Sequence, residues 1–238
     1  MRTHHSTRSD AGIARAVAAL FLISTGAYIV GSGMVPAAMT GADFLPQVAA
    51  NASETTLGVL FQLLNNAAVI VIGLLFYPIA MRYNATIAIG YLVTRLVEAL
   101  LLSIGALSAL ALVTLSQTTI ASQSWDTPAA LTAATLLVAT SQDAFTIAML
   151  ALGLGSLPLC YLLYQTRLIP PVLALLGLVG YAALPAGSVA QLLGVDLQML
   201  HFLPGGLFEF LLPLWLLVRG FNPSPAVRFA TVAAGGQP

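Results

Sequence analysis

The sequence predicts an all-α protein, a polytopic transmembrane bundle of six helices with both termini in the cytoplasm. Of its 238 residues, 59% are hydrophobic and only 7% are charged, whereas a soluble domain has about 25% charged residues. The hydrophobic residues also gather in six runs, each long enough for a bilayer crossing of about 20 residues. Eight arginines balance eight acidic residues, so the chain lacks both the charged surface of a soluble domain and the basic stripe of a nucleic-acid-binding protein.

The first three predicted spans are residues 13–35, 55–80 and 85–115. The first follows three arginines, but its apolar stretch is longer than the 7–15 residues of a secretory signal, so we expect an uncleaved helix. A short turn around Arg82 joins the second span to the third. As a helix the third run would be about 45 Å long. Because the hydrocarbon core is about 30 Å thick, we expect this helix to tilt or to project from the bilayer.

The other three predicted spans are residues 129–164, 172–189 and 202–218. The fourth run divides near Gln142, and its second part is long enough to cross the membrane alone. We therefore expect residues 129–140 to continue the helix outside the bilayer. All six spans are expected to form a single domain over residues 1–238.

Arginine placement predicts the orientation of this domain. Six crossings put the N-terminus, two short turns and the C-terminal tail on one side, which then holds seven of the eight arginines: Arg2, Arg8, Arg15, Arg82, Arg167, Arg219 and Arg228. The charged residues on the other side are all acidic: Asp43, Glu54, Asp126 and Asp196. By the positive-inside rule, the arginine-rich side is cytoplasmic.

A small set of polar residues inside the apolar runs forms the predicted binding site. Arg95 and Glu98 are three residues apart, which places them on one helix face, where they can pair. Counting helical rise from the ends of the spans puts Asn66 and Glu209 at a similar depth. The predicted ligand- or proton-binding residues are Arg95, Glu98, Glu209 and Asn66, followed by Asn65 and Asp143. The sequence leaves open whether Asp143 is buried or lies at the outer mouth of the site.

The charges of this set favour a binding function. Glu98, Asp143 and Glu209 together with Arg95 leave an excess of two negative charges, and each lone charge at the bilayer centre costs about 2.5–3.5 kcal/mol or more. Protons, a bound cation or a cationic ligand would offset the excess. We therefore expect a midplane site that binds or transports a small solute or a proton. The alternative is a structural or regulatory membrane protein, in which a buried Arg–Glu–Asn network only locks helix packing.

No catalytic motif supports an enzyme. The chain has no hydrolase elbow, zinc-protease motif, P-loop or dinucleotide fingerprint. His201 is the one candidate base for an intramembrane enzyme, and we expect it instead to be an interfacial residue at a helix start. Cys160 is the only cysteine and is expected to be a buried apolar side chain. No metal or cofactor is expected.

Several short stretches resemble the bacterial membrane family called domain of unknown function 4386. They are Gly90–Ala99, Leu163–Pro170, Gly206–Phe210, Trp215–Phe221 and the pair Tyr77–Pro78. The resemblance implies a multi-pass protein of the bacterial cytoplasmic membrane and supplies no activity. It places Arg95, Glu98 and Glu209 on the positions that give the family its polar character. Pro171 departs from the pattern, since a basic residue is expected there.

The expected partners follow from these observations. They are the lipid bilayer and a small polar solute or a proton. Glycine-rich helix faces are compatible with a homodimer, and no nucleic-acid partner is expected.

Overall fold

The computed structural model describes residues 3–36, 43–195, 197 and 199–222, which are helical apart from short turns and contain no strand. Six of the helices are long and apolar enough to cross a membrane, so the predicted six-helix, all-α fold is confirmed. The elements are α1 (Thr3–Met34), α2 (Phe44–Ala50), α3 (Ala52–Ala80), α4 (Ala85–Ala121), α5 (Pro128–Thr166), α6 (Pro171–Leu192), the 3-10 turn η1 (Leu200–Phe202) and α7 (Leu203–Val218).

Local sequence explains where these helices begin. The Asn84 side chain accepts a hydrogen bond from the Ile87 backbone N–H at 3.0 Å and caps α4. Thr127 caps α5 in the same way, through Ala130 at 3.3 Å. Proline occupies the first turn of α5 and of α6, where its missing N–H leaves no intrahelical hydrogen bond unmade.

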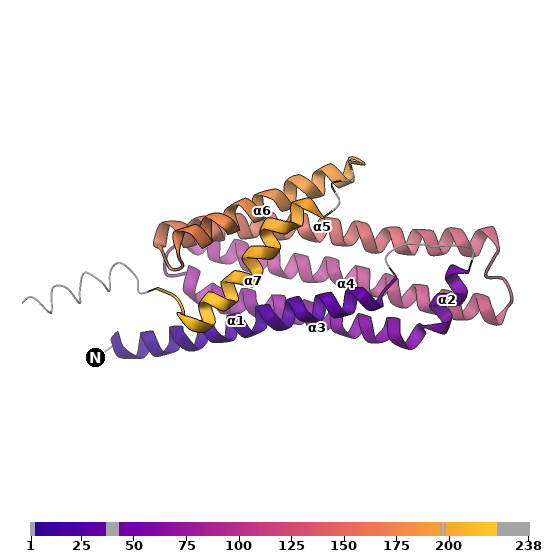
Figure 1. Ribbon diagram of the computed structural model, residues 1–238, viewed down its shortest axis with the longest axis horizontal. Coiled ribbons are helices and arrows are strands. Elements are labelled where there is room, and N and C mark those ends of the chain that lie inside the picture. The colour runs from indigo at the N-terminus through magenta and orange to yellow at the C-terminus, as the bar shows by residue number, and fades with distance from the viewer. Residues whose placement is uncertain (1–2, 37–42, 196, 198, 223–238) are drawn as a thin grey trace, which may run out of the picture.

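The six spanning helices form a closed ring. Each packs against its neighbour in the order α1, α3, α4, α5, α6, α7, and α7 packs back against α1. The main core lies inside this ring and draws buried side chains from all six helices, among them Phe21, Phe76, Leu163, Tyr181 and Phe208. The ring therefore encloses one apolar interior in the half of the molecule that contains the start of α1 (Figure 1).

Two helices extend beyond the ring. α4 has 37 residues and α5 has 39, so each is about 55 Å long or more. In Figure 1 they run past the ends of α1 and α6 to a tip that α2 covers. A second core holds this extension together, in which Phe44 and Leu45 of α2 pack with Leu112 of α4 and Ala134 of α5. The projection expected for residues 129–140 is thus part of the fold.

The extension also differs from the sequence expectation in one respect. The third span was predicted to end at residue 115, but the Ser/Thr-rich segment that follows continues α4 to Ala121. Its hydroxyl groups donate to carbonyls one turn earlier, as in Ser116 to Leu112 at 2.8 Å and Thr119 to Leu115 at 2.9 Å. These bonds satisfy the polar side chains within the helix, so the helix does not end where the apolar run ends.

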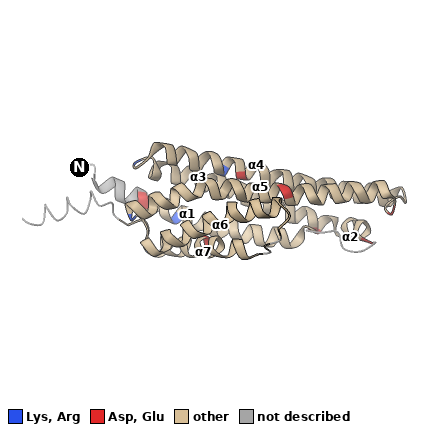
Figure 2. Ribbon diagram, turned by 90° about the horizontal axis from the view of Figure 1, so that it is seen from above, with Lys and Arg blue, Asp and Glu red and all other residues tan. Residues whose placement is uncertain are grey.

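Hydrogen bonds tie the arginine-rich turns to the ends of the chain. Arg82, between α3 and α4, forms a bidentate ion pair with Asp10 of α1 at 2.7 Å. The Asn222 side chain, beyond α7, donates to the carbonyl of Arg167 at 2.9 Å. Figure 2 shows the described arginines gathered toward this half of the bundle. Arg2, Asp196 and Arg228, which belong to the orientation argument, lie outside the described residues.

Candidate functional site

The six predicted site residues occupy two separate places. Arg95, Glu98 and Glu209 lie within the ring, whereas Asn65, Asn66 and Asp143 line a cavity farther from the N-terminal end. Gly73 is the α3 residue that packs on the side chain of Arg95, and Asn66 precedes it by seven residues, or about 10 Å of helix. The two groups are therefore about two helical turns apart.

Arg95 and Glu98 form an ion pair inside the ring. Arg95 Nη1 donates to Glu98 Oε2 at 2.7 Å, and the two side chains are only 2% and 4% exposed. The i, i+3 spacing predicted this pair, and the structure contains it. A side chain at Gly73 would place its Cβ 3.1 Å from Arg95 Cβ, so glycine on α3 makes room for the buried arginine.

Aromatic rings complete the environment of Arg95. Its Nε donates to the Tyr91 hydroxyl at 3.0 Å, and its guanidinium carbon lies 5.4 Å from the Tyr91 ring centre and 5.8 Å from that of Phe21. Such contacts stabilise a cation through the negative ring face. The positive charge is thus partnered by one carboxylate, one hydroxyl and two rings, all within the protein.

Glu209 belongs to a neighbouring network rather than to this ion pair. The Tyr181 hydroxyl of α6 donates to Glu209 Oε1 at 2.8 Å, and the Glu209 side chain is partly buried. Neither of the two ion pairs among the described residues includes Glu209. Arg95 and Glu209 therefore lie in the same ring without meeting directly.

A chain of hydrogen bonds joins α1, α3 and α4 beside the cavity. Ser24 donates to Asn65 at 2.5 Å, Asn65 donates to Asn66 at 3.3 Å, and Asn66 donates to Ser103 at 3.1 Å. The Ser103 hydroxyl ends the chain on the carbonyl of Ala99 at 2.7 Å. Each side chain in this series donates to the next one, from Ser24 toward α4. The two asparagines are thereby held in fixed positions.

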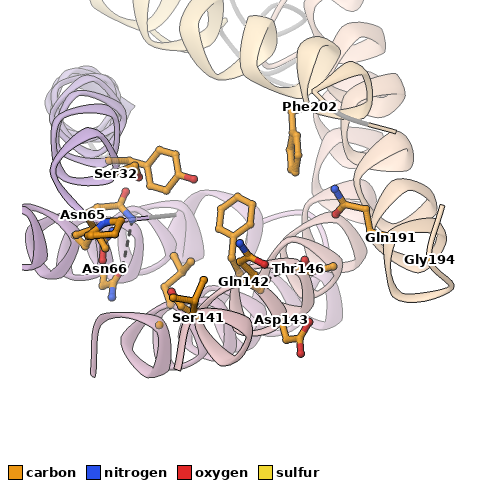
Figure 3. Close-up of a pocket in the computed structure, with 18 of the residues that line it drawn as sticks. Ser32, Asn65, Asn66, Ser141, Gln142, Asp143, Thr146, Gln191, Gly194 and Phe202 are labelled. Atoms are coloured by element: carbon orange, nitrogen blue, oxygen red, sulfur yellow. Dashed lines mark hydrogen bonds between the residues drawn. The ribbon is translucent and has the colours of Figure 1, made fainter. Parts of the chain in front are cut away.

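The cavity has a volume of about 540 Å³, within the range of small-molecule sites. It lies where α1 and α6 end while α3, α4 and α5 continue, and Figure 3 shows Asn65 and Gln191 on opposite sides of it. Its polar lining consists of Tyr28, Ser32, Gln62, Asn65, Asn66, Ser141, Gln142, Asp143, Thr146 and Gln191. Amide and hydroxyl groups therefore dominate its chemistry.

Asp143 carries the only formal charge among the described residues that line the cavity. Its side chain is exposed rather than buried. In Figure 3 it lies at the edge of the lining, with its carboxylate directed away from Asn65 and Asn66. A single carboxylate among neutral groups favours an uncharged or positively charged solute over an anion.

Three aromatic rings from different elements form one wall of the cavity. Tyr28 of α1 stacks on Phe145 of α5, with 5.9 Å between ring centres and an interplanar angle of 14°. Phe202 of η1 lies 5.8 Å from Phe145. This wall fixes the end of α1 and the start of the last span against α5, and it gives the cavity an apolar side.

A comparison with known protein families gives a match that includes both groups of site residues. The sequence pattern described as "Domain of unknown function (DUF4386)" matches residues 16–220 of this chain. The chain belongs to this family. The matched segment includes all six predicted site residues and all of the ring helices except the first part of α1. No curated protein and no solved structure matches the chain.

Several polar residues around Arg95 and Glu209 and around the cavity were not predicted from the sequence. Tyr91 and Tyr181 were not singled out, although each is a tyrosine deep within an apolar run rather than at its end. Ser24 and Gln191 were missed because isolated polar residues are common in helices. The cavity side of α5 did leave a signal, since the break at Ser141–Asp143 lies on the cavity wall.

His201 and Cys160 take no part in the polar networks. His201 is buried in η1 and packs on Gly187, and its ring lies 3.8 Å from that of Phe202 at an interplanar angle of 42°. Cys160 is buried in the main core. No group of three or more potential His, Cys, Asp or Glu metal ligands occurs among the described residues.

Proposed function

We propose that this membrane protein binds a small polar solute in the cavity bounded by Asn65, Asn66 and Asp143. The observation that carries the proposal is the cavity itself, which has about 540 Å³ of space and ten polar lining residues. Intramembrane polar residues are costly unless they are partnered. A lining of this size therefore favours a site for a hydrated or polar guest over a packing contact.

The position of the cavity suggests from which side the solute arrives. We place the protein in the bacterial cytoplasmic membrane with the arginine-rich half toward the cytoplasm, as the positive-inside rule requires. The cavity lies between the ends of α1 and α6 that are farthest from this half. The solute would accordingly enter from the side opposite the cytoplasm.

The lining suggests a chemical class. Asn66, held by its bond to Ser103, and Asn65 present amide groups to a guest. Asp143 adds one negative charge, and the described lining residues include no arginine, lysine or histidine. A neutral amide or polyol, or a small ammonium compound, matches these groups, whereas an anion has no positive partner.

A thermal-shift experiment on the purified chain in detergent tests the proposal. The panel contains glycerol, acetamide, tetramethylammonium and, as the anion, phosphate. A solute present at 100 times its Kd stabilises the folded state by about 2.7 kcal/mol, which raises Tm by roughly 5–10 °C for a chain of this size. We expect a shift with at least one neutral or cationic compound and none with phosphate.

Two variants make the test specific to the cavity. Asn66→Leu removes an amide from the lining and should abolish the shift, whereas Arg82→Ala, at the distant surface ion pair, should retain it. If no panel member raises Tm, or if Asn66→Leu responds like the unchanged protein, the cavity is not a binding site.

A second candidate function applies to the ring rather than to the cavity. Arg95 and Glu98 are buried and paired with each other on one helix, which favours a packing device over a ligand site. We propose that this pair locks α4 within the ring, and that Glu209, the ring acid without a basic partner among the described residues, is the candidate proton site. Glu209→Gln should then remove any proton dependence of solute binding while leaving the Arg95–Glu98 pair intact.

A further inference from the structure

A second, much smaller cavity lies at the centre of the ring. It leaves about 10 Å³ for the centre of a water molecule, close to the least space that holds one. All six spanning helices contribute to its lining, which includes Phe21, Phe76, Tyr91, Ser156, Tyr181 and Phe208. Most of the lining is apolar, but three of these residues, Tyr91, Ser156 and Tyr181, carry a hydroxyl group.

The hydrogen bonds that these hydroxyl groups already make leave one of them free to donate and another free to accept. Tyr91 accepts from Arg95 Nε, so its own hydroxyl proton remains available to donate. Tyr181 donates its proton to Glu209, so its oxygen remains available to accept. Ser156 Oγ is buried and has no hydrogen-bond partner among the described residues.

We propose that this cavity holds one internal water molecule that bridges Tyr91, Ser156 and Tyr181. The water accepts from the Tyr91 hydroxyl and donates to the Tyr181 oxygen, and Ser156 supplies a third partner. Internal waters make about three hydrogen bonds to buried polar groups that would otherwise lack them. The water then joins Glu98, Arg95 and Tyr91 to Tyr181 and Glu209 in one network that crosses from α4 to α7.

This proposal is independent of solute binding in the outer cavity. It concerns different residues. It also explains how Glu98 and Glu209, which form no direct hydrogen bond with each other, can be connected inside the six-helix ring. It assigns Tyr91 and Tyr181 as positioning residues, which orient the Arg95 guanidinium and the Glu209 carboxylate respectively.

A double-mutant cycle on the full chain tests the bridge. Tyr91→Phe and Tyr181→Phe should each lower Tm, and the double variant should lose less than the sum of the two, because either change already breaks the bridge. Tyr161→Phe is the control, since Tyr161 is exposed and its hydroxyl accepts a hydrogen bond from Gln165, its one partner within the described part of the chain. Paired with Tyr91→Phe, it should give losses that add to within about 1–2 °C.

Two further measurements separate a water bridge from direct contact between the rings. Ser156→Ala should lower Tm. Ser188→Ala removes another buried hydroxyl that has no partner in the described ranges, and it should leave Tm unchanged or raise it. A high-resolution density map should show one spherical peak within hydrogen-bond distance of both tyrosine oxygens. Additive losses in the Tyr91–Tyr181 cycle, equal behaviour of the two serine variants or a map without that peak would each overturn the proposal.

Discussion

Arg95 shows how a single charged residue is accommodated in an apolar ring. Removing a cation from water is expensive, and its attraction to a carboxylate offsets that cost only when the geometry is good and the remaining donors are satisfied. Here Glu98 lies 2.7 Å away, Tyr91 accepts from Nε at 3.0 Å, and Gly73 leaves room for the side chain. The cost of burial is therefore offset locally, largely by residues of α4 itself.

Breaking the pair should be far more damaging than replacing it. We expect Arg95→Met to lower the free energy of unfolding by about 3–5 kcal/mol, because Glu98 remains buried without a partner. The double variant Arg95→Met, Glu98→Met should recover most of that loss. Thermal denaturation in detergent measures both changes.

The surface pair of Arg82 and Asp10 provides the control for this prediction. The hydrogen bonds that Arg82 donates to Asp10 raise the pKa of Arg82, but the Arg82 side chain is 46% exposed. Arg82→Ala should therefore cost no more than about 1 kcal/mol. Equal losses for Arg95→Met and Arg82→Ala would show that the buried pair does not lock the ring.

At the residue scale, sequence predicts partners within a helix better than partners between helices. The Arg95–Glu98 pair follows from a spacing of three residues, which fixes both side chains on one face. The contacts of Glu209 with Tyr181 and of Asn65 with Ser24 depend on how neighbouring helices are rotated and shifted. No spacing within one apolar run contains that information.

Close helix contacts at glycine determine much of the packing between elements. At the α6–α7 contact, a Cβ added to Gly180 would lie 2.5 Å from the Cα of Gly205, so the two backbones approach as closely as glycine permits. Small residues at such crossings let membrane helices pack tightly. The crossing brings Tyr181 of α6 within reach of Glu209 of α7.

Gly180→Ala should therefore force α6 and α7 apart. Overpacking of a tight contact typically costs about 1–3 kcal/mol, and we expect a corresponding fall in Tm together with a weaker Tyr181–Glu209 contact. Gly206→Ala is the matched control, because a Cβ there has nothing within 4 Å and alanine favours the helix by up to about 1 kcal/mol. A fall in Tm for Gly206→Ala as large as for Gly180→Ala would contradict this account.

Element lengths show the limit of hydrophobicity as a guide. Apolar runs predicted the number of spans, because a bilayer imposes a minimum length. They underestimated α4, since hydroxyl side chains that bond back to carbonyls allow a helix to continue into polar sequence. The short helix α2 lies within a segment with no apolar run of membrane length, and it is helical where it packs on α4.

The whole molecule combines a six-helix ring with a narrower extension. Sequence predicted which segments cross the membrane, and arginine placement predicted which turns share an end. Hydrogen bonds between Arg82 and Asp10 and between Asn222 and Arg167 tie neighbouring segments at that end. The cavity was beyond prediction, because it arises where α1 and α6 end beside longer helices, and the relative heights of packed helices are a property of the assembled fold.

Orientation in the membrane can be measured by thiol labelling. In a Cys160→Ala background, Tyr83→Cys marks the arginine-rich end and Ser122→Cys marks the far tip, and both positions are exposed. The positive-inside rule predicts that the arginine-rich end faces the cytoplasm. A membrane-impermeant maleimide applied to intact cells should then label the Ser122→Cys variant only. After permeabilisation both variants should react. Labelling of Tyr83→Cys in intact cells would reverse the proposed topology.

The unbroken run of α5 from the tip to the wall of the cavity has a mechanical consequence. Its helix covers Pro128–Thr166 and includes Ser141, Gln142 and Thr146 on the way. A continuous helix moves as a rigid body. A protein or antibody fragment that binds the protruding α4–α5 hairpin would therefore also restrain the α5 wall of the cavity. If the cavity binds a solute as proposed, a ligand of that hairpin should therefore change how tightly the solute binds.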